Sequence, residues 1–224
     1  MPFLVIPAGG RGLRMGGSVP KQFMDWEGRP LLLATIEAFF GPEMPKIEGI
    51  AIALPLDRIE EISKWELPAP HWCAEGGATR QESVHAALKM LDEFPPDEAA
   101  MIHDAVRPFP PPGAINEAIA LLGEWDGAVL AEASTDTLKR VGPDFQIIAT
   151  EPREQVYRAQ TPQVAKLSTW RRAFAWVAAN GFNGTDDVSM LEAMGLKVRI
   201  VPSPSSNRKI TVQEDWEIIK GIRG

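Results

Sequence analysis

A glycine-rich loop that carries its own cations could hold a phosphate group. The loop runs from Ala8 to Gly17 and follows Phe3–Pro7, an apolar run typical of a strand. Glycines let backbone amides approach an anion closely, and such amides form a cradle for it. Arg11, Arg14 and then Lys21 add positive charge. We therefore expect phosphate binding here, and the alternative is a solvated turn with scattered charges.

The spacing of these glycines disfavours two common phosphate-binding motifs. A dinucleotide-binding loop uses G-x-G-x-x-G, whereas Gly10 and Gly12 are followed by Gly16, one residue too late. No obvious acidic ribose ligand closes the second expected strand, Ile50–Leu54. A Walker loop ends in G-K-[ST], which is absent. A nicotinamide-dependent oxidoreductase is therefore disfavoured.

Three further polar segments follow expected strands, and basic residues lie mostly on or beside them. They are Gly76–Arg80, His103–Pro108 and Ser134–Thr137. In open parallel sheets, ligands bind beyond the carboxyl ends of the strands, so we expect these segments to meet the glycine loop at one rim. The basic residues on or beside this rim are Arg14, Lys21, Arg80, Arg107, Lys139, Arg140, Arg153, Arg208 and Lys209.

Short apolar runs alternate with longer amphipathic segments along the chain. The expected strands are Phe3–Pro7, Ile50–Leu54, His71–Ala74, Ala99–His103, Gly127–Ala133 and Lys197–Val201. The expected helices are Leu31–Phe40, Arg58–Trp65 with Asp57 as its N-cap, Thr79–Leu91, Ala114–Leu122, Lys166–Asn180, Asp186–Met194 and one that starts at Gln213. This alternation predicts an α/β, Rossmann-like fold: a mainly parallel twisted sheet with helices on both faces.

The pattern changes between Thr135 and Val156. Leu138–Val141 and Gln146–Thr150 flank a Gly142-Pro143-Asp144 turn, which predicts a β-hairpin inserted into the α/β domain. An isolated hairpin is marginally stable in water, so we expect it to pack on something, for example a second subunit. We see no internal repeat and no linker. We therefore expect a single domain over residues 1–224 with a hairpin arm at about 135–156.

Composition and charge argue against several classes of protein. Of 224 residues, 45% are hydrophobic and 24% are charged, which are ordinary globular values. The net charge of −7 argues against binding nucleic acid through bulk positive charge. No apolar stretch reaches the ~20 residues that span a bilayer, and the first residues resemble a strand rather than a signal peptide. The single cysteine, Cys73, rules out an internal disulfide and makes a cytoplasmic location the default.

Eight motifs of this chain match, in order, those of a known enzyme family. They are Pro7–Met15, Pro20–Gln22, Gly76–Val84, His103–Pro108, Asp136–Lys139, Thr161–Gln163, Thr185–Asp187 and Lys209–Thr211. Together they resemble the 2-C-methyl-D-erythritol 4-phosphate cytidylyltransferase family over nearly the whole chain. One departure is Gly9, where the family usually has alanine; the glycine should loosen the phosphate cradle slightly.

The resemblance implies transfer of CMP from CTP to a sugar-alcohol phosphate by a homodimer, with release of pyrophosphate. The implied catalytic residues are Arg14, Lys21, Arg153 and Lys209, and the implied ligand of Mg²⁺ or another divalent cation is Asp104. The implied nucleotide-binding residues are Ala8, Gly9, Gly10, Gly12, Arg14, Lys21, Gly77, Ala78, Ser83, Asp104 and Ala105. The implied acceptor-binding residues are Asp104, Arg107, Thr137, Arg153, Thr161 and Lys209, with Arg153 reaching across the dimer.

Other interpretations stay open at this point. Asp104 could cap a helix, Arg107 could be a surface ion-pair partner, and Thr79–Gln81 could be no more than a helix start. The acceptor could be ribitol 5-phosphate, since related enzymes share the fold and the nucleotide motifs. A regulatory protein that keeps the pocket without chemistry is a different class. We expect no nucleic-acid or membrane partner.

Several other residues that could do chemistry are left out of the expected site. His71 and His85 have no metal-ligand spacing with Cys73, so zinc is not expected. His103 is expected to orient its loop by hydrogen bonding rather than to act as a base. Arg208 is expected to be a solvated charge.

Overall fold

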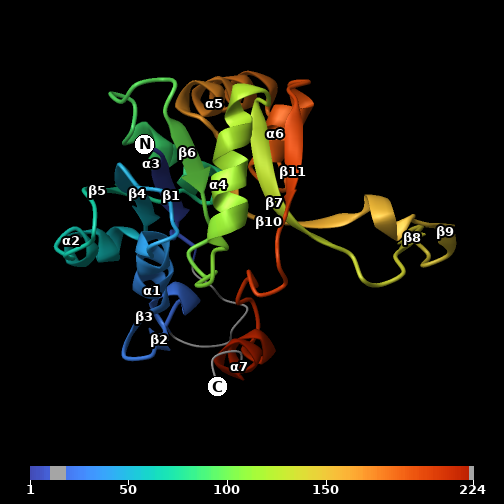
Figure 1. Cartoon of the computed structure of the whole chain (residues 1–224), viewed down its shortest axis with the longest axis horizontal. Coiled ribbons are helices and arrows are strands. Elements are labelled where there is room, and N and C mark those ends of the chain that lie inside the picture. The colour runs from blue at the N-terminus through green and yellow to red at the C-terminus, as the bar shows by residue number, and fades with distance from the viewer. Residues whose placement is uncertain (11–18, 222–224) are drawn as a thin grey trace.

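A seven-stranded sheet forms the centre of the protein (Figure 1). The structure, a computed structural model, describes residues 1–10 and 19–221. The strands of the sheet are β1 (Phe3–Pro7), β4 (Gly49–Leu54), β5 (His71–Glu75), β6 (Ala99–Ile102), β7 (Gly127–Ala133), β10 (Tyr157–Lys166) and β11 (Val198–Pro202). Their order is β11-β7-β10-β6-β1-β4-β5, and β10 alone runs antiparallel to its neighbours. The predicted mainly parallel sheet is confirmed.

Helices cover both faces of the sheet, because successive side chains of a strand point to opposite sides. In β1, Leu4 and Ile6 pack with one buried cluster, whereas Phe3 and Val5 pack with another. The first cluster includes residues of α1 (Leu31–Glu37), α2 (Ile59–Ile62) and α4 (Pro112–Ala120). The second includes residues of α3 (Arg80–Lys89), α5 (Leu167–Asn180) and α6 (Val188–Ala193). All four β1 side chains are fully buried, and each such burial stabilises the fold by about 1.5–3 kcal/mol.

A small layer of short elements lies below the sheet in Figure 1. Strands β2 (Asp25–Trp26) and β3 (Arg29–Pro30) form a hairpin, and α7 (Gln213–Gly221) packs beside it. The rings of Trp26 and Trp216 meet edge to face at 5.3 Å and join the two elements. The short 3-10 turns are η2 (Lys21–Phe23), η3 (Ala38–Phe40), η4 (Leu56–Arg58), η5 (Leu121–Gly123) and η6 (Arg153–Gln155).

The predicted hairpin forms an arm that stands away from the rest of the molecule (Figure 1). It consists of β8 (Lys139–Val141) and β9 (Ile147–Thr150), paired antiparallel. Its apolar side chains are exposed, with Phe145 at 85% and Ile148 at 63%. Buried apolar contacts within this chain therefore do not hold the arm in place.

Strand β10 is the strand of the central sheet that the sequence interpretation missed, and the short strands β2 and β3 were not expected either. We expected a helix from Lys166 and no strand before it, whereas β10 occupies Tyr157–Lys166 and α5 begins at Leu167. The segment contains Pro162 and several polar residues, which argue against a central strand. A register shift between Ala159 and Gln163 accommodates this irregular sequence between β6 and β7.

The other errors concern where elements begin and end. The expected helix Arg58–Trp65 with Asp57 as its N-cap is wrong: Asp57 lies inside η4, and α2 covers only Ile59–Ile62. Helix α4 begins at Pro112, because proline is well suited to the first turn of a helix. No helix in the described ranges is long and apolar enough to cross a membrane.

Candidate active site

Two glycine loops, which follow β1 and β5, pack against each other at the carboxyl end of the sheet. A Cβ on Gly9 would stand 3.0 Å from the Cα of Gly76 and 3.0 Å from Oγ of Ser83. The backbones of Gly9 and Gly76 are therefore in close contact, and a side chain at Gly9 would have little space. The amide of Ala8 donates to the carbonyl of Ala53 at 2.7 Å and ties the first loop to β4. The sequence-predicted loops are thus brought together.

The Gln22 side chain holds the first glycine loop in shape. Its Nε2 donates to the carbonyl oxygen of Ala8 at 2.7 Å and to that of Gly10 at 2.6 Å. Gln22 is 3% exposed, so water competes little for these hydrogen bonds. The sequence alone indicated no role for Gln22, although it lies in the Pro20–Gln22 motif.

The second glycine loop leads into α3 through a capping box. Oγ1 of Thr79 accepts from the amide of Glu82, and the Glu82 carboxylate accepts from the amide of Thr79, both at 3.1 Å. A Cβ on Gly77 would collide with the Glu82 side chain, so the turn requires glycine there. Ala78 is exposed beside it. The expected helix start is confirmed, and it presents Gly77 and Ala78 at the rim.

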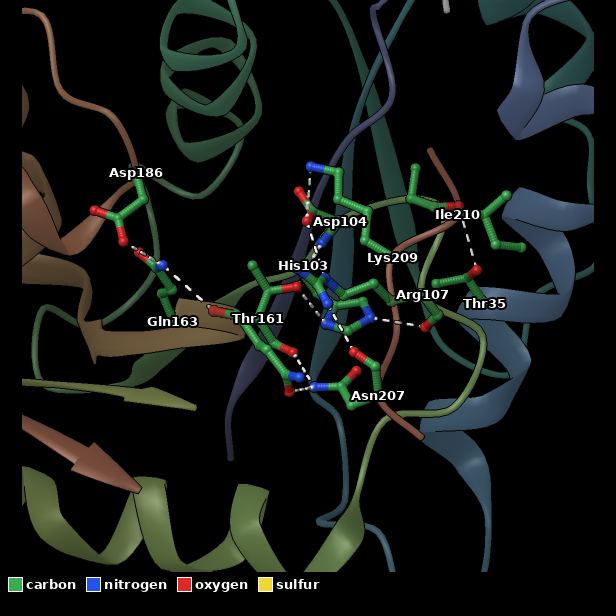
Figure 2. A network of polar contacts seen from close by, with 12 residues as sticks. Thr35, His103, Asp104, Arg107, Thr161, Gln163, Asp186, Asn207, Lys209 and Ile210 are labelled. Carbon is green, nitrogen blue, oxygen red and sulfur yellow. Dashed lines mark hydrogen bonds and ion pairs between the residues drawn. The ribbon is translucent and has the colours of Figure 1, made fainter. Parts of the chain in front are cut away.

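Asp104 lies directly after β6 and is surrounded by three cations. Its Oδ1 lies 3.2 Å from Nε of Arg80. Its Oδ2 lies 3.1 Å from Nε of Arg107 and 3.0 Å from Nζ of Lys209 (Figure 2). Asp104 does not cap a helix, because Ala105 and Val106 form a turn rather than a helix. Arg107 is not a surface ion-pair partner, since it is buried.

The electrostatics keep the Asp104 carboxyl ionised. Burial by itself would raise its pKa, but the positive charges of Arg80, Lys209 and Arg107 outweigh burial and hold the pKa well below its ordinary value. The result is a fixed negative charge inside a positive cluster. An ionised carboxylate of this kind can bind a cation, and the surrounding cations can bind phosphates.

Arg80 links Asp104 to a second buried carboxylate, Asp187. Nη1 and Nη2 of Arg80 donate to the two oxygens of Asp187 at 2.7 and 2.8 Å, a bidentate geometry. Burial and the neighbouring Asp104 and Asp186 carboxylates raise the pKa of Asp187, and Arg80 opposes this. Sequence reasoning placed Arg80 at the rim but not in the site. The one signal for it was its place in the Gly76–Val84 motif.

A chain of hydrogen bonds through His103 fixes the backbone at Asp104. The carbonyl of Arg107 lies 3.0 Å from Nε2 of His103, so Nε2 carries the proton and donates. Nδ1 then accepts from the hydroxyl of Thr161 at 3.1 Å, and Thr161 Oγ1 accepts from the amide of Asp104 at 3.1 Å. Burial lowers the pKa of His103 to about 4, so the ring is neutral near pH 7. These contacts agree with the expectation that His103 orients its loop.

The segment after β11 brings Lys209 to the site and is tied at both ends. The Asn207 side chain donates to the carbonyl of Thr161 at 2.8 Å, and the backbone carbonyl oxygen of Asn207 accepts from Nη1 of Arg107 at 2.7 Å. The amide of Ile210 donates to the carbonyl of Val106 at 3.0 Å. Asn207 was not predicted as a site residue, because its partners lie far away in the sequence.

Lys21 joins the first loop to this same segment. Its Nζ donates to the carbonyl oxygen of Ile210 at 2.9 Å, next to Lys209 in the chain. Thr35 of α1 supports the opposite side by donating to the carbonyl of Ala105 at 3.2 Å. Lys21 therefore contacts the segment that carries Lys209, and Lys209 in turn contacts Asp104. Arg208 pairs with Asp215 at 3.3 Å and keeps 40% of its side chain exposed, so its charge is partly paired and partly solvated.

Some predicted site residues are not part of this network. Thr137 and Arg153 are exposed on the arm and its root, and Arg153 contacts its neighbour Glu154 at 3.5 Å. Gly12 and Arg14 lie outside the described residues, so their roles stay predictions.

Comparison with known proteins identifies the family. The chain matches IspD, 2-C-methyl-D-erythritol 4-phosphate cytidylyltransferase, over residues 3–222. The chain belongs to this family. A cytidylyltransferase of this name from Gloeobacter violaceus is 39% identical over 227 residues, covering 98% of this chain and 94% of the relative. One from Symbiobacterium thermophilum is 35% identical over 215 residues, covering 96% and 89%.

Solved structures of the cytidylyltransferase family share the fold. The 4-diphosphocytidyl-2C-methyl-D-erythritol synthase of Anaerococcus prevotii superposes with a TM-score of 0.83 at 27% identity, covering 100% of this chain and 99% of that one. The cytidylyltransferase of Francisella tularensis superposes with a TM-score of 0.82 at 27% identity, covering 98% of each chain. The resemblance expected from the eight motifs is confirmed.

Proposed function

We infer that this protein transfers CMP from CTP to 2-C-methyl-D-erythritol 4-phosphate and releases pyrophosphate, a step of isoprenoid biosynthesis. The observation that carries this inference is the family match over residues 3–222. The relatives described above carry this activity in their names. The cations around Asp104 support it, because the reaction brings several anionic groups together.

The reaction needs positioning and positive charge rather than covalent catalysis. An acceptor phosphate oxygen attacks the α-phosphorus of CTP in line, a new P–O bond forms, and the bond to the β-phosphate oxygen breaks. Pyrophosphate leaves with that electron pair. Negative charge grows on the equatorial and leaving oxygens, so preorganised cations stabilise the transition state. We assign this role to Lys21 and Lys209, which lie on adjoining segments, and to Arg14.

The backbone of the two glycine loops frames the nucleotide in this proposal. A Cβ on Gly10 would meet nothing within 4 Å, so CTP can approach the backbone there, and the same two loops include or border Ala8, Gly9, Gly77, Ala78 and Ser83. A buried site that hydrogen-bonds an exocyclic amine discriminates strongly against bases that lack it. We assign the choice of cytosine to these loops.

Asp104 fits a divalent cation such as Mg²⁺. The carboxylate is ionised and faces the rim, and one carboxylate with phosphate oxygens and water is the usual magnesium arrangement. Among the described residues no three His, Cys, Asp or Glu side chains gather as metal ligands, so the remaining ligands would come from the phosphates and from water. When bound, the ion would neutralise part of the phosphate charge.

We further propose that the protein works as a cytoplasmic homodimer built through the arm. Val141, Phe145, Ile147 and Ile148 expose apolar surface that a second copy would cover. Such an arrangement would place Arg153 and Thr137, at the root of the arm, beside the acceptor in the partner subunit. A single cysteine, which is partly buried in β5, agrees with a reducing compartment.

A panel of substrates tests the function. Pyrophosphate release is measured with CTP, UTP or ATP, with 2-C-methyl-D-erythritol 4-phosphate or ribitol 5-phosphate, and with or without Mg²⁺. We expect turnover with CTP and methylerythritol phosphate in the presence of Mg²⁺. Turnover of ribitol 5-phosphate alone would replace the assigned acceptor. Tight CTP binding by calorimetry without turnover of either acceptor would favour a regulatory protein.

A further inference from the structure

Both carboxylate oxygens of Asp104 contact protein cations. Arg80 lies on Oδ1, whereas Arg107 and Lys209 lie on Oδ2. A divalent ion that binds this carboxylate therefore needs one of the three cations to leave. Mg²⁺ also gives up its water reluctantly, so a carboxylate already shared by three cations is a poor site for the free ion.

The contacts of the three cations show which of them can leave. Arg80 is held by a bidentate pair with the buried Asp187. Arg107 is buried and donates through Nη1 to the carbonyl of Asn207 at 2.7 Å. Lys209 has a third of its side chain exposed, and in the part of the chain that the structure describes its ammonium contacts Asp104 alone. A flexible lysine stem also lets the ammonium move without moving the backbone.

We propose that Lys209 is a gate for the divalent cation: in the absence of nucleotide its ammonium occupies Asp104 and excludes the ion. The nucleotide phosphates then attract the ammonium away, and the carboxylate becomes available to the ion that arrives with them. Metal and nucleotide consequently bind together. This inference rests on the proposed function, and it adds an order of events that the function does not require.

Manganese is a suitable probe, because free Mn²⁺ gives an electron paramagnetic resonance signal that is lost on binding. Titrations without nucleotide compare the wild-type protein, Lys209→Met and Arg208→Met. The last variant removes the same charge one residue away, from a side chain that pairs with Asp215 rather than Asp104. Lys209→Met leaves Arg80 and Arg107 on Asp104, so we expect it to fold; Lys209→Gln serves as a second variant.

We expect Lys209→Met to bind Mn²⁺ at least tenfold more tightly than the wild-type protein, and Arg208→Met to change the affinity less than twofold. Adding Asp104→Asn to Lys209→Met should abolish the gain. An equal affinity of wild-type and Lys209→Met protein overturns the gate, as does an equal gain in Arg208→Met. If the substrate panel shows CMP transfer while Lys209→Met gains nothing, the gate fails and the function stands. Without CMP transfer the function itself fails.

Discussion

Gly9 and Gly76 touch through their backbones, although they follow strands that are separated by β4. A Cβ on Gly76 would stand 2.8 Å from the Cα of Gly9 and 3.5 Å from the carbonyl oxygen of Leu54. The amide of Gly76 donates to that same carbonyl at 2.8 Å. The two loops therefore close over the end of β4 as one unit, and neither can shift without the other.

A methyl group at Gly76 tests this contact. Because real Cβ atoms essentially never approach a backbone atom to 2.8 Å, Gly76→Ala forces the loops apart. We expect a loss of about 1–3 kcal/mol in the free energy of unfolding and weaker CTP binding, measured by urea denaturation and calorimetry. Gly113→Ala on α4, where a Cβ meets open space, is the control and should not lower stability. Equal behaviour of the two variants would contradict the contact.

Lys21→Ala should reduce turnover far more than CTP affinity. Its ammonium is tied to the carbonyl of Ile210 beside Lys209, where charge grows as the α-phosphorus becomes five-coordinate. Loss of one such electrostatic contact typically costs about 10²–10³-fold in rate. Steady-state kinetics give kcat, and calorimetry gives the CTP dissociation constant. Equal losses in the two quantities would argue for a role in ground-state binding instead.

Arg153→Ala should raise the KM for the sugar-alcohol phosphate and leave the KM for CTP nearly unchanged. Arg153 is exposed and its one described ion pair is with the adjacent Glu154, so its charge is available to an acceptor phosphate. Removal of a binding contact to a charged group costs about 1.5–3 kcal/mol, or roughly 10–100-fold. Arg172→Ala, an exposed arginine on α5, is the matched control. An unchanged acceptor KM removes Arg153 from the site.

Deletion of residues 138–148 should convert a dimer into a monomer. The arm exposes Phe145 and Ile148, and apolar surface of this kind is buried in stable dimers. Sedimentation velocity reports the change in mass. A milder variant, Phe145→Ser with Ile148→Ser, keeps the hairpin backbone and should weaken association in the same direction. A dimer that survives both changes would place the interface elsewhere.

His103 makes stability depend on pH in a defined direction. Burial lowers its pKa from 6.5 to about 4, so between these values the unfolded chain takes up a proton that the native state does not. Stability is therefore lost as the pH falls through this window. Compared with His103→Gln, which does not titrate, the wild-type protein should lose about 2 kcal/mol more between pH 7 and pH 5. Urea denaturation at the two pH values measures this, and equal losses in the two proteins would show that the pKa of His103 is not lowered in the native state.

Most strands of the sheet and the hairpin arm were predictable, because short apolar runs and turn residues mark them in the local sequence. Gly49–Leu54 is an uninterrupted apolar run, and Gly142-Pro143-Asp144 is a strong turn signal between two short strands. Strand β10 was not predictable in this way, since Pro162 and its polar neighbours become buried only through pairing with β6 and β7.

The site was predictable as a set of loops but not as a network. Resemblance placed Lys21, Asp104 and Lys209 in one site, and the structure brings them together. The pairing of Arg80 with Asp187 joins residues 107 positions apart, and no local pattern reports such a contact. The resemblance assigned Thr161 to acceptor binding. In the structure its hydroxyl instead hydrogen-bonds to His103 and to the backbone amide of Asp104. These contacts depend on the antiparallel pairing of β10 with β6, which the sequence did not predict.

Strand β10 has one more consequence. It pairs with β7 at Tyr157, where the arm ends, and four residues later it carries the hydroxyl that secures Asp104. One continuous strand thus runs from the surface where two copies would associate to the place where phosphates would react. Association and specific activity should then be thermodynamically coupled: dilution below the dissociation constant of the dimer would erode turnover per chain, although each separated chain still carries Lys21, Asp104 and Lys209.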